Sequence, residues 1–131
     1  MTTTKLGYTI VYVRDVKRTA DFWERAFGIP QRAADHELYR EMDTGGHTLA
    51  FVAHSYIRDN IPGGFRPAQN DEAPPPFEIA LTTDDVAAAL DRALKAGAHK
   101  VLAPTKKPWG QTIAYVRDCD GNLVELCTPM S

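Results

Sequence analysis

Cysteine is scarce in this chain of 131 residues, which contains only Cys119 and Cys127. Both lie near the end of the sequence, and no further cysteine is present to build a disulfide framework around them. No cysteine and histidine pair has the spacing of a zinc site either. We therefore expect reduced thiols and a cytoplasmic protein.

Long apolar runs and regions of one charge are absent as well. No stretch approaches the roughly 18 consecutive apolar residues of a membrane span. The formal net charge is -2, from 15 basic and 17 acidic residues that are interspersed along the chain. Because no basic stripe is present to neutralise phosphates, we expect neither nucleic acid nor a membrane as a partner. A Gly-rich phosphate loop and a nucleophile elbow are also missing.

The first half of the chain reads as a strand, a helix and two short strands. Residues 6–13 are β-branched and aromatic enough to predict a strand. Helical spacing follows, with Asp15 as the expected cap and Gly28 as the left-handed residue at the end. Strands are then predicted at 37–42 and 47–53, separated by a Gly-Gly turn.

The same order of elements returns in the second half. A strand is predicted at 77–82, followed by a helix that begins at Asp84 and ends at Gly97. Three further strands are predicted at 99–102, 112–116 and 123–127. The residues Asp-Cys-Asp-Gly-Asn between the last two strands are typical of a hairpin turn.

Spacing supports an internal duplication. Tyr8 precedes Asp15 by seven residues, as Glu78 precedes Asp85. We therefore predict an α+β fold, a single domain of two repeated β-α-β-β-β modules at residues 5–54 and 77–128. The joining loop, 55–76, is either a linker or a functional cover over a cleft, with Tyr56 and Phe65 as candidate packing residues.

Three segments resemble one known superfamily and together cover most of the chain. They read YTIVYVRDVKRTADFWERAFGI, FEIALTTDDVAAALDRALKAGA and KPWGQTIAYVRDCDGNLVELCTP. The first two resemble the strand and helix that open each module of the vicinal oxygen chelate superfamily, which includes glyoxalases, bleomycin-resistance proteins and extradiol dioxygenases. The third resembles its closing hairpin. The resemblance implies that the strands of the two modules curl into a β cup.

In that superfamily, the first and last strands of each module direct one side chain each into the cup. In the metalloenzymes these side chains hold a divalent metal that acts as a Lewis acid. Carried onto this sequence, the four positions are Tyr8, Ala50, Glu78 and Glu125. Tyr8 is a poor ligand at its ordinary pKa, and Ala50 has no donor atom. The resemblance thus implies either no cofactor or a divalent metal (Mn, Fe, Ni, Zn or Mg) held by Glu78 and Glu125.

One interpretation is a metal-free binding pocket. The drug-sequestering members of the superfamily lack metal ligands and hold flat molecules between aromatic rings. The Pro-Trp-Gly-Gln segment resembles their pocket wall, and Trp109 there offers a rigid stacking surface. Tyr8, Phe65 and Gln111 are the other expected ligand contacts. A place in the core or in a dimer interface is the alternative for Trp109.

A second interpretation is an altered enzyme. If Glu78 and Glu125 face each other, they cannot both ionise easily, so one pKa rises or a cation binds. A carboxyl group with a raised pKa suits general acid–base catalysis, and Tyr8 would donate a hydrogen bond to a developing oxyanion. A structural ion pair with a neighbouring Arg or Lys is the alternative for Glu78.

Of these interpretations we favour binding of a small aromatic or oxygen-rich molecule in the cup, with a degenerate metal-ligand set. The alternative is a divalent-metal-dependent lyase, isomerase or dioxygenase of the same superfamily, similar to lactoylglutathione lyase. Its catalytic residues would be Glu125, Glu78 and Tyr8. The resemblance also leads us to expect a homodimer.

Overall fold

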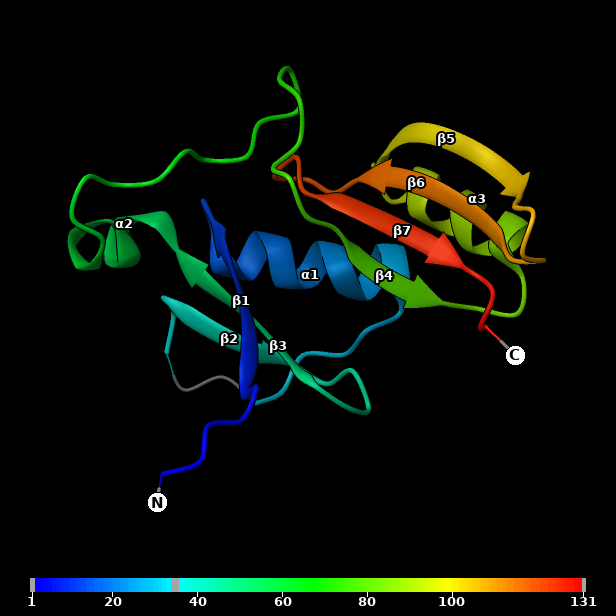
Figure 1. Cartoon of the computed structure of the whole chain (residues 1–131). Coiled ribbons are helices and arrows are strands. Elements are labelled where there is room, and N and C mark those ends of the chain that lie inside the picture. Colours follow the sequence, from blue (N-terminus) through cyan, green and yellow to red (C-terminus); the bar gives the residue numbers. More distant parts are fainter. Residues whose placement is uncertain (1, 34–35, 131) are drawn as a thin grey trace. The chain divides into compact units, whose positions relative to one another are not determined.

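The structure, a computed structural model, describes residues 2–33 and 36–130 and has the predicted α+β fold (Figure 1). The chain divides into two compact units, the first up to Glu24 with Ile29–Pro67, the second Arg25–Gly28 with the chain from Ala68 onward. The elements are β1 (Tyr8–Val13), α1 (Val16–Phe27), β2 (Tyr39–Met42), β3 (Thr48–Ala53), α2 (His54–Ile57), the 3-10 helix η1 (Arg58–Asn60), β4 (Ile79–Thr82), α3 (Val86–Lys95), β5 (His99–Lys106), β6 (Thr112–Arg117) and β7 (Leu123–Cys127).

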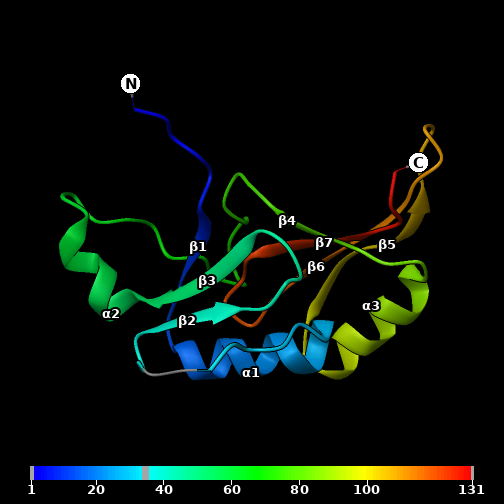
Figure 2. The same cartoon turned by 90° about the horizontal axis from the view of Figure 1, so that it is seen from below.

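The first unit is a three-stranded sheet in the order β1-β3-β2, with α1 on one face (Figure 2). The β1 strand runs parallel to β3, and β2 runs antiparallel to it. Trp23 of α1 is fully buried and packs against Phe51 of β3, with ring centroids 5.5 Å apart. Beyond β2, the described part of this unit has no further strand but an isolated antiparallel bridge between Gln31 and Met42.

The alternation of β1 gives the first sheet one covered and one open face. Val11 and Val13 are buried, whereas Tyr8 and Ile10 are 57% and 45% exposed. Successive side chains of a strand point to opposite faces. Tyr8 and Ile10 therefore lie on the face opposite α1.

Both predicted helices are present, although the second begins later than its predicted start at Asp84. The side chain of Asp15 accepts a hydrogen bond from the Arg18 amide at 3.1 Å, and Gly28 has the expected positive φ. In the second unit the cap is Asp85, not Asp84, because the Asp85 carboxylate accepts from the amide of Ala88. This is the side-chain-to-N3 geometry of an N-cap.

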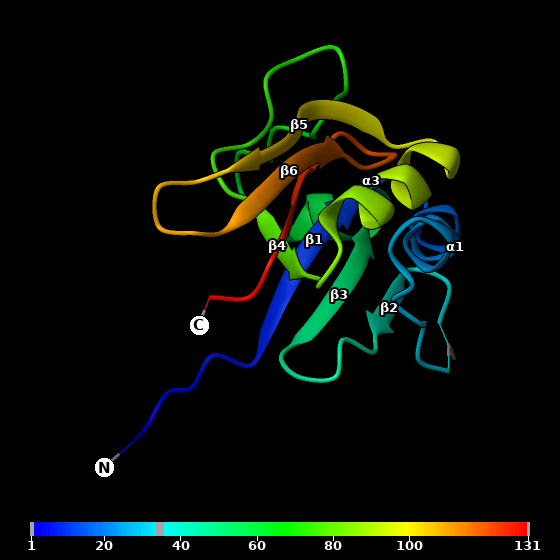
Figure 3. The ribbon, with the colours of Figure 1, turned by 90° about the vertical axis from the view of Figure 1, so that its right-hand side faces the viewer.

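The second unit is a four-stranded sheet in the order β4-β7-β6-β5, with α3 against one face (Figure 3). Val86, Leu90 and Ala93 form the buried side of α3. The β5 strand continues to Lys106, well beyond its predicted end at residue 102. Pro104 is accommodated because β5 is an edge strand whose register shifts between Leu102 and Thr105.

The segment 55–76 is shared between the two units. Its first part contains most of α2 and all of η1, and Phe65 packs edge-on against Tyr12 at 4.9 Å and His54 at 5.1 Å. Tyr56 is 53% exposed. Its second part is bound to the β6–β7 hairpin through Arg117, whose guanidinium donates to the Gln69 and Glu72 carbonyls.

Within the described residues, no helix has the length and apolar character needed to cross a membrane.

Candidate functional site

Three ionisable side chains converge on the open face of the second sheet. Glu125 lies in the middle of β7, and Tyr115 of β6 is its cross-strand partner. Directly opposed residues of an antiparallel pair point to the same face. Ala80 pairs with Glu125, and Glu78 lies two residues before Ala80. Because every second residue of an extended chain points to the same face, Glu78 also lies on this face. Val124 and Leu126 point the other way and are buried.

Glu78 and Glu125 form a hydrogen-bonded acid pair. Partial burial raises the pKa of Glu78, and the hydrogen bond and the charge of the neighbouring Glu125 raise it further. This is the behaviour expected of two carboxyl groups that share one proton. Such a pair offers a hydrogen-bond donor and acceptors side by side.

Two further groups beside the acid pair stay protonated at neutral pH. Burial, the hydrogen bond with Glu125 and the nearby carboxylate charges raise the pKa of Tyr115 to about 12. The same causes raise the pKa of the Cys127 thiol to about 11. The cluster therefore presents neutral phenol and thiol groups beside the two carboxyl groups.

The acid pair makes stability depend on pH. Because the folded state holds the Glu78 proton more tightly than the unfolded state, this contribution to stability is complete below the ordinary carboxyl pKa and is lost as the pH rises through the raised value. Gln mimics the protonated carboxyl at every pH. We expect Glu78→Gln to be more stable than wild type by about 0.5 kcal/mol at pH 7 and equal to it at pH 3.5, measured by urea unfolding.

The matched control for this experiment is Glu72→Gln, which removes an exposed carboxylate of the same unit. Its stability should differ from that of wild type by less than about 0.5 kcal/mol, as is usual for an exposed substitution. A Glu78→Gln variant that is less stable than wild type at pH 7 would mean that Glu78 acts as a stabilising anion.

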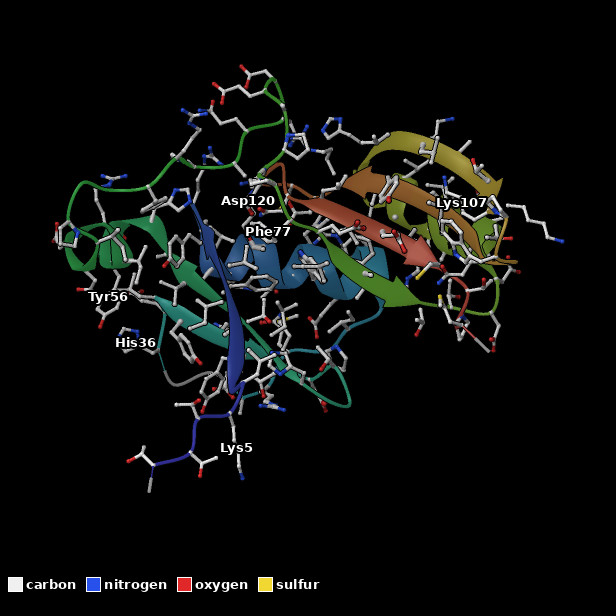
Figure 4. All side chains as sticks on the ribbon, in the orientation of Figure 1. Lys5, His36, Tyr56, Phe77, Lys107 and Asp120 are labelled. Atoms are coloured by element: carbon white, nitrogen blue, oxygen red, sulfur yellow. The ribbon has the colours of Figure 1, made fainter. Side chains whose placement is uncertain are left out.

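Trp109 and Gln111 lie in the turn between β5 and β6. This turn begins at Lys107, which Figure 4 labels. The indole Nε1 of Trp109 donates to Oε1 of Gln111 at 2.9 Å, and Nε2 of Gln111 donates to the Thr128 carbonyl at 2.8 Å. Trp109 is nevertheless 64% exposed. It is therefore an oriented aromatic surface and not part of the core of the chain.

In the first unit, the open sheet face carries a different polar group, which was not predicted from the sequence. Glu41 of β2 accepts hydrogen bonds from Tyr39 and from Arg32, each at 2.8 Å. These partners lower the pKa of Glu41, while burial and the bond to Glu41 raise the pKa of Tyr39 to about 12. Tyr8 lies near enough to add to the Tyr39 shift.

The two open faces are related by register. Ala50 of β3 is buried and lies directly opposite Glu41, just as Glu125 lies opposite Tyr115. In the second unit the carboxylate, Glu125, lies on the last strand of the unit. In the first unit the carboxylate, Glu41, lies on the neighbouring strand, opposite Ala50 of the last strand. The sequence contained enough information to find these pairs. Counting residues outward along both strands from each predicted hairpin turn pairs Glu41 with Ala50 and Tyr115 with Glu125.

Within the second unit, the structure brings some of the predicted site residues together. Glu78 and Glu125 are brought together, and Trp109 is brought together with Gln111. Tyr8 lies on the first sheet, and Phe65 packs on Tyr12 and His54.

The donor set does not fit the chelated metal of the superfamily's enzymes. Ala50 has no donor, and Tyr8 is a phenol where those enzymes have an imidazole. Among residues 2–33 and 36–130, no group of three or more His, Cys, Asp or Glu side chains is arranged to hold a metal ion. No chemical step is therefore assigned to a metal.

Comparison with known proteins gives consistent matches over nearly the whole chain. The family model described as Glyoxalase/Bleomycin resistance protein/Dioxygenase superfamily matches residues 5–126. The uncharacterized protein YraH of Bacillus subtilis (strain 168) is 24% identical over 123 residues, which are 93% of this chain and 96% of YraH.

Solved structures show the same fold at low sequence identity. A glyoxalase/bleomycin resistance protein/dioxygenase family enzyme from Burkholderia phytofirmans PsJN is 19% identical, with a TM-score of 0.78 and coverage of 95% of this chain and 98% of that one. A glyoxalase-related enzyme from Fulvimarina pelagi is 18% identical, with a TM-score of 0.81 and coverage of 97% and 89%. TioX from Micromonospora sp. ML1 is 22% identical, with a TM-score of 0.70 and coverage of 95% and 98%.

Proposed function

Because this chain belongs to the Glyoxalase/Bleomycin resistance protein/Dioxygenase superfamily, we propose that it binds a small aromatic or oxygen-rich molecule on the open face of the β4-β7-β6-β5 sheet. The observation that carries the proposal is the hydrogen-bonded pair of Glu78 and Glu125, with Tyr115 beside it. Hydroxyl groups of the ligand would replace the hydrogen bond that the two carboxyl groups make with each other.

The acid pair is better explained by ligand recognition than by stability. Two carboxyl groups side by side on a sheet repel each other once both are ionised, so they weaken the folded state at neutral pH. Their face also differs from the opposite one, where Val116, Val124 and Leu126 are buried. Departures from a stabilising pattern are expected where a site has a function.

An aromatic contact comes from Trp109 in this proposal. Its ring is exposed and is held in one orientation by Gln111, so stacking on it costs little conformational entropy. An offset-stacked ring adds about 0.5–1.5 kcal/mol beyond burial. Trp109→Ala should therefore weaken binding of an aromatic ligand by roughly threefold to tenfold.

A second candidate function is proton transfer, and the raised pKa of Glu78 favours it. A carboxyl group whose pKa lies closer to neutral exchanges a proton more readily with a carbon acid than an ordinary one does. Glu78 would act as the acid or base and Tyr115 as a hydrogen-bond donor to the oxyanion. In this case Glu78→Gln would abolish turnover while ligand binding persisted.

The binding proposal is tested with catechol, which has two vicinal hydroxyl donors, and with 1,2-dimethoxybenzene, which has none. Titration of the isotopically labelled full chain is followed by amide chemical shifts. We expect catechol to shift the amides around Glu125 and Tyr115 and to bind at least tenfold more tightly than the dimethoxy compound. Glu125→Gln should weaken catechol binding by about tenfold to 100-fold, the value of a hydrogen bond to a charged group.

Two controls make this experiment specific. Glu72→Gln should leave catechol binding unchanged, and so should prior treatment with EDTA, because the proposed contacts need no metal. Equal binding of the two compounds, or catechol shifts confined to other parts of the chain, would refute the proposal. Loss of binding in EDTA would restore a metal-dependent site.

A further inference from the structure

Two adjoining cavities lie in the second unit, along the last turn of α1 and one side of α3. The outer cavity has a volume of about 670 Å³ and the inner one about 310 Å³, and Ala88 and Arg92 line both. Volumes of about 300–1,000 Å³ are typical of small-molecule sites.

These cavities are separate from the acid pair. Leu81 and Leu126 line the inner cavity, and both point to the α3 side of the sheet. Glu125 is the neighbour of Leu126 in β7, so its side chain points to the opposite face. A ligand in these cavities would leave Glu78 and Glu125 untouched.

The chemistry of the two cavities differs. The outer one is bordered by Arg25, Arg92 and Lys95, against the single carboxylate of Asp91. The partial negative charges of the two helix ends offset about one of these positive charges, so a net positive charge remains. Polar atoms form as much of the surface of the inner cavity as apolar atoms do, and its apolar contacts come chiefly from Phe27, Leu81 and Leu126. It is also lined by Ala26, Thr82, Thr83, Ala88, Ala89 and the shared Arg92.

Arg92, which lines both cavities, is held in place by contacts with α1 and Gly28. Its Nε donates to the Arg25 carbonyl at 2.9 Å. Its guanidinium lies over Gly28, where a Cβ atom would come within 2.7 Å of Nη1. A guanidinium fixed in this way is ready to bind a carboxylate without ordering a long side chain first.

From this arrangement we infer that the chain has a second binding site, which takes a small amphiphilic carboxylate. The carboxylate lies in the outer cavity against Arg25, Arg92 and Lys95, and the apolar tail enters the inner cavity beside Phe27 and Leu126. The three cations of the outer cavity match the charge of such an acid, and Phe27, Leu81 and Leu126 of the inner cavity offer apolar contacts to its tail.

The test uses octanoate and, as a neutral ligand with the same chain length, octan-1-ol. Each is titrated into the isotopically labelled full chain, and amide chemical shifts locate the site. We expect octanoate to shift the amides of α3 and of Ala26 and Phe27. The double variant Arg25→Gln, Lys95→Gln should weaken octanoate binding about tenfold and change octan-1-ol binding less than twofold, because only octanoate has a charge.

A large side chain at Ala88, which lines both cavities, provides the independent arm. Ala88→Phe should abolish binding of both compounds, whereas Ala87→Phe, an exposed position of α3 outside the cavities, should leave both unchanged. Retention of octanoate binding by Ala88→Phe would overturn the inference. Chemical-shift changes caused by octanoate at β7 instead of α3 would also overturn it. So would an equal weakening of octanoate and octan-1-ol binding in the double charge variant.

Two further measurements distinguish this site from the acid pair and from a dimer interface. Glu125→Gln should leave octanoate binding unchanged, because the acid pair does not line the cavities. The proposed catechol site and the proposed carboxylate site can therefore fail independently of each other. Sedimentation of wild type and Ala88→Phe without ligand tests whether a second copy of the chain covers the cavities. A dimer that Ala88→Phe dissociates would replace the carboxylate site with an interface.

Discussion

Arg117→Ala is expected to lower the free energy of unfolding by about 3 kcal/mol and the midpoint of thermal unfolding by roughly 10 °C. The guanidinium is only 8% exposed and donates to three backbone carbonyls: Gly121 at 2.7 Å, Glu72 at 2.9 Å and Gln69 at 2.7 Å. Alanine would leave these acceptors without their charged donor and would open a cavity.

Further contacts make relaxation around Arg117 difficult. Gly121 has a φ of +96°, and a Cβ atom there would lie 2.7 Å from the Gln69 backbone. Asn70 also donates to the Asp118 carbonyl at 3.2 Å. The segment that Arg117 holds is therefore fixed closely against the β6–β7 turn, so the loss of Arg117 should detach it.

Chemical denaturation of wild type, Arg117→Ala and Arg117→Lys measures this effect. Lysine keeps the charge but cannot reach three carbonyls with a rigid fork of donors, so its variant should fall between the other two. Arg58→Ala, at an exposed residue of η1, is the control and should change stability by less than about 0.5 kcal/mol. If Arg117→Ala behaves like Arg58→Ala, the three hydrogen bonds contribute little to folding.

The second large effect concerns the reactivity of Cys127. At pH 8 we expect iodoacetamide to modify this thiol at least about 100-fold more slowly than an ordinary cysteine. The rise in its pKa from 9.0 to about 11 reduces the thiolate fraction by that factor, and its 3% exposure slows access further. Mass spectrometry of the two cysteine sites over time gives both rates in one sample.

The chain supplies an internal control in Cys119, which is only half-buried. In denaturant the two thiols should react at similar rates. Because burial and then Glu125 raise the Cys127 pKa, Glu125→Gln should speed its modification several-fold in the folded protein without changing that of Cys119. Equal rates for the two cysteines in the folded protein would contradict the geometry of the acid cluster.

Much of the fold was predictable because hydrophobic periodicity and turn residues are local properties. In the described part of the chain, α1, α3 and the seven strands fall within predicted segments or extend them by a few residues, whereas most of α2 and all of η1 lie in the segment predicted as a loop. The main differences came from interactions that local pattern does not include. The cap at Asp85 depends on backbone geometry, and the extension of β5 depends on pairing with β6 despite Pro104.

The candidate site was predictable only in part. Positions in the superfamily pattern led to Glu78 and Glu125, which the structure places in contact. The same pattern missed Tyr115, Glu41 and Arg32, because their positions follow from strand pairing, which the resemblance did not address.

By itself, the sequence determined that two strand–helix repeats must each bury one face of a sheet, since the spacing of apolar residues is a property of the chain alone. It also determined that Ala50 has no donor atom. Only the tertiary structure decided which ionisable groups meet. Strand pairing sets which residues lie opposite each other, and the alternation of side chains along a strand sets which of them share a face. That is why the proximity of Glu78 and Glu125, the Glu41 ion pair and the cavities beside Arg92 became visible only in the folded chain.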